Sequence, residues 1–194
     1  MSGSDSAGHP DAPDSPSERV RALIRSVPGF PRAGVSYKDI TPLIEDGGGM
    51  RLAVDALAQA IDAAGIEYDR IVSAEARGFV FGTALAYRAR RGIVLARKPG
   101  KLPRETISAS YDLEYGSDSL EVHADSIPPG ARVLVADDLL ATGGTARAMC
   151  RIVENAGGAV AGAAFIIELG YLRGRTLLDP YKTVSLVNYE DPSE

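Results

Sequence analysis

The hydrophobic positions of the chain follow two periods, one typical of amphipathic helices and one typical of buried strands. Apolar residues recur every three or four positions in residues 51–64 and 145–156, and glycine follows each segment, which predicts two helices. Short, strongly apolar runs at residues 70–74, 132–136 and 160–169 predict buried strands. Similar patterns predict helices at residues 18–26 and 78–91 and strands at residues 93–97, 119–123 and 183–187.

The alternation of strands with helices predicts an α/β fold with a mainly parallel sheet flanked by helices. A chain of 194 residues, 45% of them hydrophobic, is long enough for one well-filled core, so we predict a single domain over residues 18–194. Residues 1–17 are rich in Ser, Asp and Pro and are predicted to be a disordered tail, with Ser17 as the cap of the first helix. Residues 28–44 hold too many breakers for regular structure, but their apolar side chains predict an ordered, packed loop.

Composition excludes several classes of protein. The net charge of -5 argues against general nucleic-acid binding. The single cysteine, Cys150, excludes an intramolecular disulfide, and apolar neighbours at helical spacing predict a buried structural thiol in a reducing compartment. No segment has the apolar length of a signal peptide or a membrane span, so we expect a cytoplasmic protein.

A predicted strand runs into two adjacent carboxylates, Asp137 and Asp138, and then into a turn with almost no side-chain bulk. That turn is Ala141, Thr142, Gly143, Gly144 and Thr145. In open α/β sheets, ligands bind beyond the carboxyl ends of the strands, where helix N-termini hold anions. Glycines allow a phosphate to approach the backbone closely, and the threonines add hydroxyl donors. No lysine follows the glycines, so the turn is not the phosphate loop of nucleoside triphosphatases.

Asp137 and Asp138 would repel a phosphate unless they faced other groups. Carboxylates accept hydrogen bonds from the vicinal hydroxyls of a sugar, and they also bind divalent cations. The segment therefore predicts a ribose 5-phosphate site, with the phosphate on the turn and the hydroxyls on the aspartates. The alternative is a solvent-exposed acidic loop that caps a helix.

A second concentration of charge lies between Arg88 and Arg104, where seven basic residues and no acidic residue occur. The arginines at residues 88–91 fall at a helix end, where a solvated face explains them. Arg97, Lys98 and Lys101 instead follow a predicted strand at its carboxyl edge, which indicates a polyanion site. Arg77 also lies between a predicted strand and a predicted helix.

The segment VLVADDLLATGGT resembles the phosphoribosyl pyrophosphate signature of the type I phosphoribosyltransferases, in the form found in the adenine phosphoribosyltransferase family. Four other stretches resemble the same family, namely FPRAGVSYKDITPLI, SAEARGFVFG, ARKPGKLP and SYDLEYG. The resemblance covers roughly residues 19–190. It implies the type I phosphoribosyltransferase fold, with a small N-terminal hood mainly at residues 28–45 and a flexible catalytic loop at about residues 99–115.

The resemblance also implies a reaction, in which adenine and phosphoribosyl pyrophosphate give AMP and pyrophosphate. The ribose and 5-phosphate would bind Asp137, Asp138 and the turn, and Mg²⁺ would be carried by the sugar donor. Arg77 and Lys98 would bind pyrophosphate.

Arg97 and Lys101 match residues associated with the neighbouring subunit's site, which implies a homodimer. The family has a cis peptide just before Arg77, here Glu75–Ala76, where it often has Asp-Ser. That departure puts the local hydroxyl contact in doubt.

For the base, the resemblance points to the hood and to one acid. Tyr37 would stack on adenine, and backbone groups of Ser36 and Lys38 would bind the edge of the base. The family commonly has arginine at Lys38, a change that a backbone contact would survive. Glu114 matches the acid–base residue near purine N7. Alternatives are a regulator that binds the sugar donor without catalysis, and a related enzyme acting on xanthine, hypoxanthine or orotate.

Overall fold

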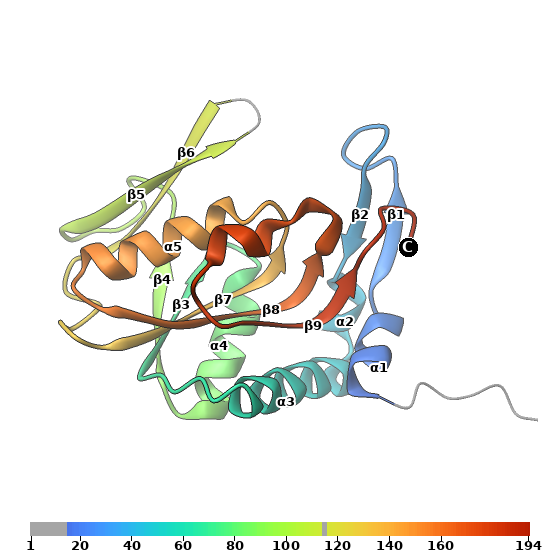
Figure 1. Ribbon diagram of the computed structural model, residues 1–194, viewed down its shortest axis with the longest axis horizontal. Coiled ribbons are helices and arrows are strands. Elements are labelled where there is room, and N and C mark those ends of the chain that lie inside the picture. The colour runs from blue at the N-terminus through green and yellow to red at the C-terminus, as the bar shows by residue number, and fades with distance from the viewer. Residues whose placement is uncertain (1–14, 114–115) are drawn as a thin grey trace, which may run out of the picture.

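A five-stranded, entirely parallel sheet forms the centre of the computed structural model, which describes residues 15–113 and 116–194. Its order is β4-β3-β7-β8-β9 (Figure 1). The strands are β3 (Arg70–Ala74), β4 (Gly92–Ala96), β7 (Arg132–Leu140), β8 (Ala159–Leu169) and β9 (Thr183–Tyr189). All five coincide with predicted strands, and the predicted α/β fold with a mainly parallel sheet is confirmed.

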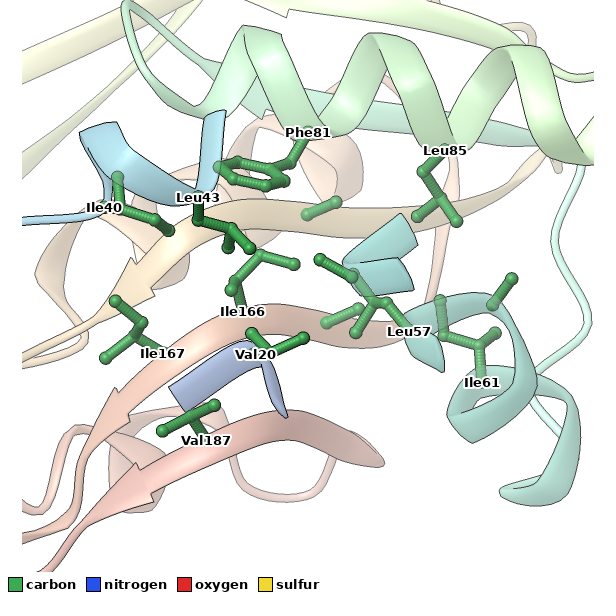
Figure 2. Packing of buried hydrophobic residues seen from close by; sticks show 14 of the residues in the cluster. Val20, Ile40, Leu43, Leu57, Ile61, Phe81, Leu85, Ile166, Ile167 and Val187 are labelled. Atoms are coloured by element: carbon green, nitrogen blue, oxygen red, sulfur yellow. The ribbon is translucent and has the colours of Figure 1, made fainter. Parts of the chain in front are cut away.

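Helices cover both faces of this sheet, which explains the continuous apolar runs of its strands. The helices are α3 (Gly47–Ala63) and α4 (Gly78–Ala89) on one face and α5 (Gly144–Asn155) on the other (Figure 1). Alternate residues of β7 separate accordingly: Leu134 packs with α3 and α4, whereas Val133 and Val135 pack with α5. Figure 2 shows part of the first cluster, where Phe81 and Leu85 of α4 pack with Leu57 and Ile166.

The N-terminal segment differs from its prediction. Helix α1 (Pro16–Ala22) is capped by Ser15, not Ser17, because Ser15 and Glu18 form a capping box. The helix also ends four residues before its predicted end at Ser26, and β1 (Arg25–Pro28) follows it. β1 pairs antiparallel with β2 (Ser36–Asp39), so the predicted irregular loop at residues 28–44 holds a strand, and then α2 (Thr41–Glu45).

A second hairpin was also only partly predicted. β5 (Thr106–Leu113) and β6 (Gly116–His123) pair antiparallel along their whole length, although the resemblance implied a flexible loop at about residues 99–115. The two hairpins lie at opposite ends of the sheet (Figure 1). Two short 3-10 helices, η1 (Gly170–Leu172) and η2 (Gly174–Leu178), connect β8 to β9.

Cys150 lies in α5 and is completely buried, as predicted. Burial raises the pKa of its thiol to about 12, so the side chain is an inert part of the core. Across the residues described, none of the helices has the length and apolarity needed to cross a membrane.

Candidate active site

A cavity of about 380 Å³ opens at the carboxyl edge of the sheet, where the sequence predicted a ligand site. Three parts of the chain form its walls. They are the β3–α4 connection at residues 74–78, residues 137–146 from β7 into α5, and the separate side chains of Lys98, Tyr111 and Leu120. Segments far apart in the sequence therefore converge on one volume.

Asp137 and Asp138 lie within β7, which continues four residues beyond its predicted end at Ala136. They are only 8% and 6% exposed, so the alternative of a solvent-exposed acidic loop is wrong. The strand continues because β7 pairs with β8 as far as Leu140. Both carboxylates are thus held by a rigid element and line the cavity.

The two carboxylates have different environments. Asp138 Oδ2 pairs with Arg77 Nε at 2.8 Å, whereas Asp137 Oδ1 accepts the backbone N–H of Asp138 at 2.9 Å. Burial and then the neighbouring charge of Asp138 raise the pKa of Asp137 well above its ordinary value. Asp137 also packs so closely on Gly78 that a Cβ there would collide with its carboxylate. Asp137 is therefore a confined, incompletely compensated acid.

The turn after β7 presents backbone donors to the cavity. Gly143 adopts a φ of +87°, which glycine tolerates, and it precedes the first turn of α5. None of the side chains that the structure describes caps this end of α5. Its first N–H groups therefore remain for a ligand, and the helix dipole favours an anion there.

A feature that the sequence analysis missed supports this turn from behind. Gly174 of η2 packs directly against the backbone of residues 141–143, and a Cβ on Gly174 would lie 2.7 Å from Gly143 N and 2.8 Å from Thr142 C. Nothing in the segment YLRGRTLL indicates the contact, because η2 reaches the turn only through the fold. The shape of the turn thus depends on a glycine some thirty residues away.

Arg77 connects the carboxylates to the hood. Besides pairing with Asp138, its guanidinium donates a hydrogen bond to the hydroxyl of Tyr37 and lies 5.6 Å from the ring centroid. The preceding peptide bond, Glu75–Ala76, is cis, as the resemblance implied. Tyr37 itself packs edge-on against Phe30, with ring centroids 5.1 Å apart.

Glu75 binds two basic side chains and one backbone N–H of the basic segment. Its carboxylate accepts from Arg97 Nε at 2.9 Å and from the backbone N–H of Lys98 at 2.8 Å, and it pairs with Lys101 Nζ at 3.2 Å. Burial raises the pKa of Glu75, but these contacts lower it by more, so the net shift is downward. The acid that replaces the family's frequent aspartate is thus an anchor for the loop after β4.

The base-binding residues predicted in the hood lie outside the lining of the cavity. Ser36, Tyr37 and Lys38 belong to β2, and among them only Tyr37 contacts a residue of the cavity wall, Arg77. The Lys38 ammonium points elsewhere: it donates to Ser26 Oγ at 2.9 Å and to the carbonyl of Glu194. The Lys38 ammonium is therefore engaged away from the cavity, and the contact of its backbone with the base stays a prediction.

The structure thus brings together one set of predicted residues and separates another. Those that line the cavity are Arg77, Lys98, Asp137, Asp138, Ala141, Thr142, Gly143, Gly144 and Thr145. Arg97 and Lys101 gather instead on Glu75, next to the cavity. Glu114 lies outside the described residues. Tyr111, which lines the cavity, was missed, although it belongs to the same short segment as Glu114.

Comparison with known proteins agrees with this geometry. The model of the phosphoribosyl transferase domain family matches residues 43–191. An adenine phosphoribosyltransferase of Rubrobacter xylanophilus is 69% identical over 175 residues, which cover 90% of this chain and 94% of that protein.

Solved structures agree as well. The adenine phosphoribosyltransferase of Thermoanaerobacter pseudethanolicus superposes with a TM-score of 0.86 at 47% identity, covering 89% of this chain and 99% of that one. The Saccharomyces cerevisiae enzyme, solved in complex with adenine and an imino-altritol bisphosphate, gives 0.84 at 35% identity, with 88% and 98% covered. The chain therefore belongs to the adenine phosphoribosyltransferase family, within the phosphoribosyl transferase domain proteins.

Proposed function

We propose that the protein transfers the 5-phosphoribosyl group of phosphoribosyl pyrophosphate to adenine, giving AMP and pyrophosphate in purine salvage. One observation carries the proposal: a single cavity joins a phosphate-binding turn, two buried carboxylates and two cations, in a member of the adenine phosphoribosyltransferase family. The turn accounts for the 5-phosphate, the carboxylates for the ribose hydroxyls, and Arg77 and Lys98 for the pyrophosphate.

In the reaction, the bond between ribose C1 and the pyrophosphate oxygen breaks, and both electrons leave with the oxygen. The C1 centre becomes oxocarbenium-like, as in glycoside hydrolysis. Arg77 and Lys98 would stabilise the charge that develops on the leaving pyrophosphate. The lone pair of adenine N9 forms the new bond to C1.

The base would be held between the hood and Glu114. Tyr37 would stack on the purine, a contact worth roughly 1–3 kcal/mol, and the backbone of Ser36 and Lys38 would bind its edge. As N9 attacks, Glu114 would accept the proton from N7, which leaves AMP in its neutral-ring form. The segment at residues 99–115, which includes β5, would exclude water, because hydrolysis of the donor competes with transfer.

The carboxylates fit Mg²⁺ bound together with the sugar donor. The residues described contain no group of three or more His, Cys, Asp or Glu side chains that could hold a metal ion. Two carboxylates at a phosphate site nevertheless match Mg²⁺, which commonly takes one or two carboxylates, water and substrate phosphates. Asp137 and Asp138 would therefore face it, directly or through water, and it would neutralise charge on the pyrophosphate.

One assay tests the function. Release of pyrophosphate from phosphoribosyl pyrophosphate and Mg²⁺ is measured with adenine, guanine, hypoxanthine, xanthine or orotate as the acceptor. At low concentrations of the base, we expect turnover with adenine and not with the other four bases. Absence of turnover with every base would support the regulator that only binds the sugar donor, and a preference for a 6-oxopurine or orotate would refute adenine specificity.

Glu114→Ala is expected to lower kcat about 100-fold, because proton transfer at the base contributes on the order of that factor. The Kd for adenine should change less than threefold. Steady-state kinetics and calorimetry measure the two quantities, with Glu105→Ala, an exposed acid of the same loop, as control. Equal losses in kcat and in adenine affinity would indicate binding instead of proton transfer.

We also propose a homodimer that uses the surface of α4 and β4. Val80, Tyr87 and Leu95 are large apolar side chains exposed on this surface, and Tyr87 is 88% exposed. A groove of about 570 Å³ lies beside Tyr87, lined in part by Met50 and Val54. Such a patch is typical of an interface. Arg97 follows β4 directly and Lys101 lies in the segment after it, so both would then lie near the neighbouring subunit's site.

Tyr87→Glu is expected to raise the dimer dissociation constant at least about 30-fold, because a charge replaces a central aromatic contact. Sedimentation velocity over a range of concentrations measures this change. Leu172→Glu serves as the control, since it adds the same charge at an exposed leucine of η1. A Tyr87→Glu protein that associates like the unmodified one would place the interface elsewhere.

A cytoplasmic location completes the proposal. The only cysteine, Cys150, is buried in the core and forms no intramolecular disulfide, which supports a reducing compartment. Cell fractionation with compartment markers tests it, and recovery from a secreted or membrane fraction would contradict it.

A further inference from the structure

The ammonium of Lys98 is held by two side chains of the β5–β6 hairpin. Lys98 Nζ donates to Asp118 and, at 3.1 Å, to the hydroxyl of Tyr111. That hydroxyl in turn donates to Asp118 Oδ2 at 3.0 Å, so the three groups form a closed triangle. The other carboxylate oxygen, Asp118 Oδ1, accepts the backbone N–H of Ser119 at 2.8 Å, which fixes its orientation.

Strand register places this triangle next to the cavity. Tyr111 and Asp118 are directly opposite each other in the antiparallel ladder, so their side chains lie on the same face of the hairpin. Arg97 and Glu121 exchange backbone hydrogen bonds of 2.9 and 2.8 Å, which tie β6 to the residue just before Lys98. The backbone therefore holds the hairpin beside the lysine.

Asp118 could either support Lys98 or compete with a ligand for its ammonium, and the position of Asp118 relative to the cavity distinguishes these two roles. Lys98 and Tyr111 line the cavity, whereas Asp118 is not part of its wall. The Lys98 side chain is 37% exposed, and two of the three ammonium N–H groups are engaged by the triangle. One N–H remains for a ligand oxygen, while the negative charge of Asp118 stays outside the cavity.

The triangle also keeps both groups ionised. Burial lowers the pKa of Lys98, but its hydrogen bonds with Asp118 and Tyr111 raise it by more, so the net shift is upward. The pKa of Asp118 is lowered, chiefly by the hydrogen bond from Lys98. Lys98 therefore presents a full positive charge at neutral pH.

Resting on the proposed function, we propose that Asp118, with Tyr111, is a positioning residue that holds Lys98 at the cavity wall for the pyrophosphate group of the sugar donor. The opposite arrangement is a carboxylate that competes with pyrophosphate for the lysine. Positioning predicts weaker pyrophosphate binding when Asp118 loses its charge, and competition predicts tighter binding.

The first test is Asp118→Asn. We expect the Kd for pyrophosphate with Mg²⁺ and the KM for phosphoribosyl pyrophosphate to rise about tenfold, as for loss of one charge-assisted hydrogen bond. Tyr111→Phe should raise both about threefold, and Asp118→Glu should restore part of the loss. The KM for adenine should change less than twofold. The control is Asp125→Asn, which removes an ion pair with Arg104 on the protein surface.

A double-mutant cycle shows whether Asp118 acts through Lys98. In a Lys98→Met background, Asp118→Asn should add no further loss of pyrophosphate affinity. Additive losses would overturn the proposal, as would an unchanged or lower pyrophosphate Kd in Asp118→Asn alone. An equal rise in the adenine KM would also overturn it, because that result indicates a disturbed hairpin. If Asp118→Asn fails to fold, Tyr111→Phe supplies the same comparison.

Calorimetry with pyrophosphate and Mg²⁺ requires no turnover. Failure of the proposed function therefore appears as absence of AMP formation by the unmodified protein, whereas failure of the positioning proposal appears in the pyrophosphate Kd of the variants.

Discussion

Gly174→Ala is expected to raise the KM for phosphoribosyl pyrophosphate about 100-fold or more, although residue 174 carries no functional group. The new Cβ would collide with the backbone of the turn at residues 141–143, including Ala141 O and Gly143 N, and we propose that this turn binds the 5-phosphate. Backbone atoms cannot rotate away as a flexible side chain can, so the turn must shift. A displacement of about 1 Å at a binding site can cost about 100-fold in rate.

The same substitution should lower the free energy of unfolding by about 1–3 kcal/mol, the usual cost of overpacking. Donor kinetics and urea denaturation measure the two effects. Gly47→Ala is the matched control, because Gly47 begins α3 and a Cβ there would meet no atom within 4 Å. A Gly174→Ala protein with an unchanged donor KM would show that η2 does not shape the turn.

Asp137→Asn is expected to stabilise the ligand-free protein while lowering kcat/KM for the sugar donor about 10- to 100-fold. The loss of activity follows from removing a charged acceptor for the ribose hydroxyls, worth roughly 1.5–3 kcal/mol. The gain in stability, about 1–2 kcal/mol, follows from removing a buried charge that is repelled by Asp138. Binding sites commonly retain such destabilising groups.

The increase in unfolding free energy caused by Asp137→Asn should become larger as pH rises. Because the folded-state pKa of Asp137 is raised, folding favours the protonated acid. The destabilisation is absent below the ordinary pKa of an aspartate and grows as pH rises toward the folded-state pKa. The unmodified protein and Asp137→Asn should therefore differ in unfolding free energy at pH 7.5 and converge near pH 4.

Asp138→Asn provides the comparison for this experiment. Asp138 is paired with Arg77 at 2.8 Å, so neutralising it leaves that guanidinium without its partner. Activity with the sugar donor should fall, but the protein should not become more stable. Denaturation curves that show equal stabilisation by both substitutions would contradict the distinction between the two carboxylates.

The prediction from sequence succeeded where the determinants are local. The strand, the turn and the helix of residues 132–156 follow one another directly, and their hydrophobic periods and glycines indicated each element. The strand end was wrong by four residues because pairing of β7 with β8, not side-chain polarity, decides where the strand stops. Asp137 and Asp138 were therefore predicted at the right site but in the wrong element.

The prediction missed both strands of the first hairpin, and of the second it found only part of β6. The short strands β1 and β2 show little apolar periodicity, and their pairing depends on backbone hydrogen bonds. Residues 106–113 do alternate between polar and apolar side chains, a strand signal that the prediction overlooked. The resemblance instead implied a flexible loop at about residues 99–115, where β5 lies. The contact of Lys98 with Asp118 follows from the register of that second hairpin.

The sequence by itself determined the parallel α/β fold, the glycine-containing turn after β7 and the identity of the residues that resemble the family's sites. These depend on local periodicity and on motifs that are contiguous in the chain. Only the tertiary structure decided that Asp118 supports Lys98, that Glu75 gathers Arg97 and Lys101, and that Gly174 backs the turn. Such contacts join residues that are far apart in the sequence. They are decided by how the elements pack together, which no local pattern of residues encodes.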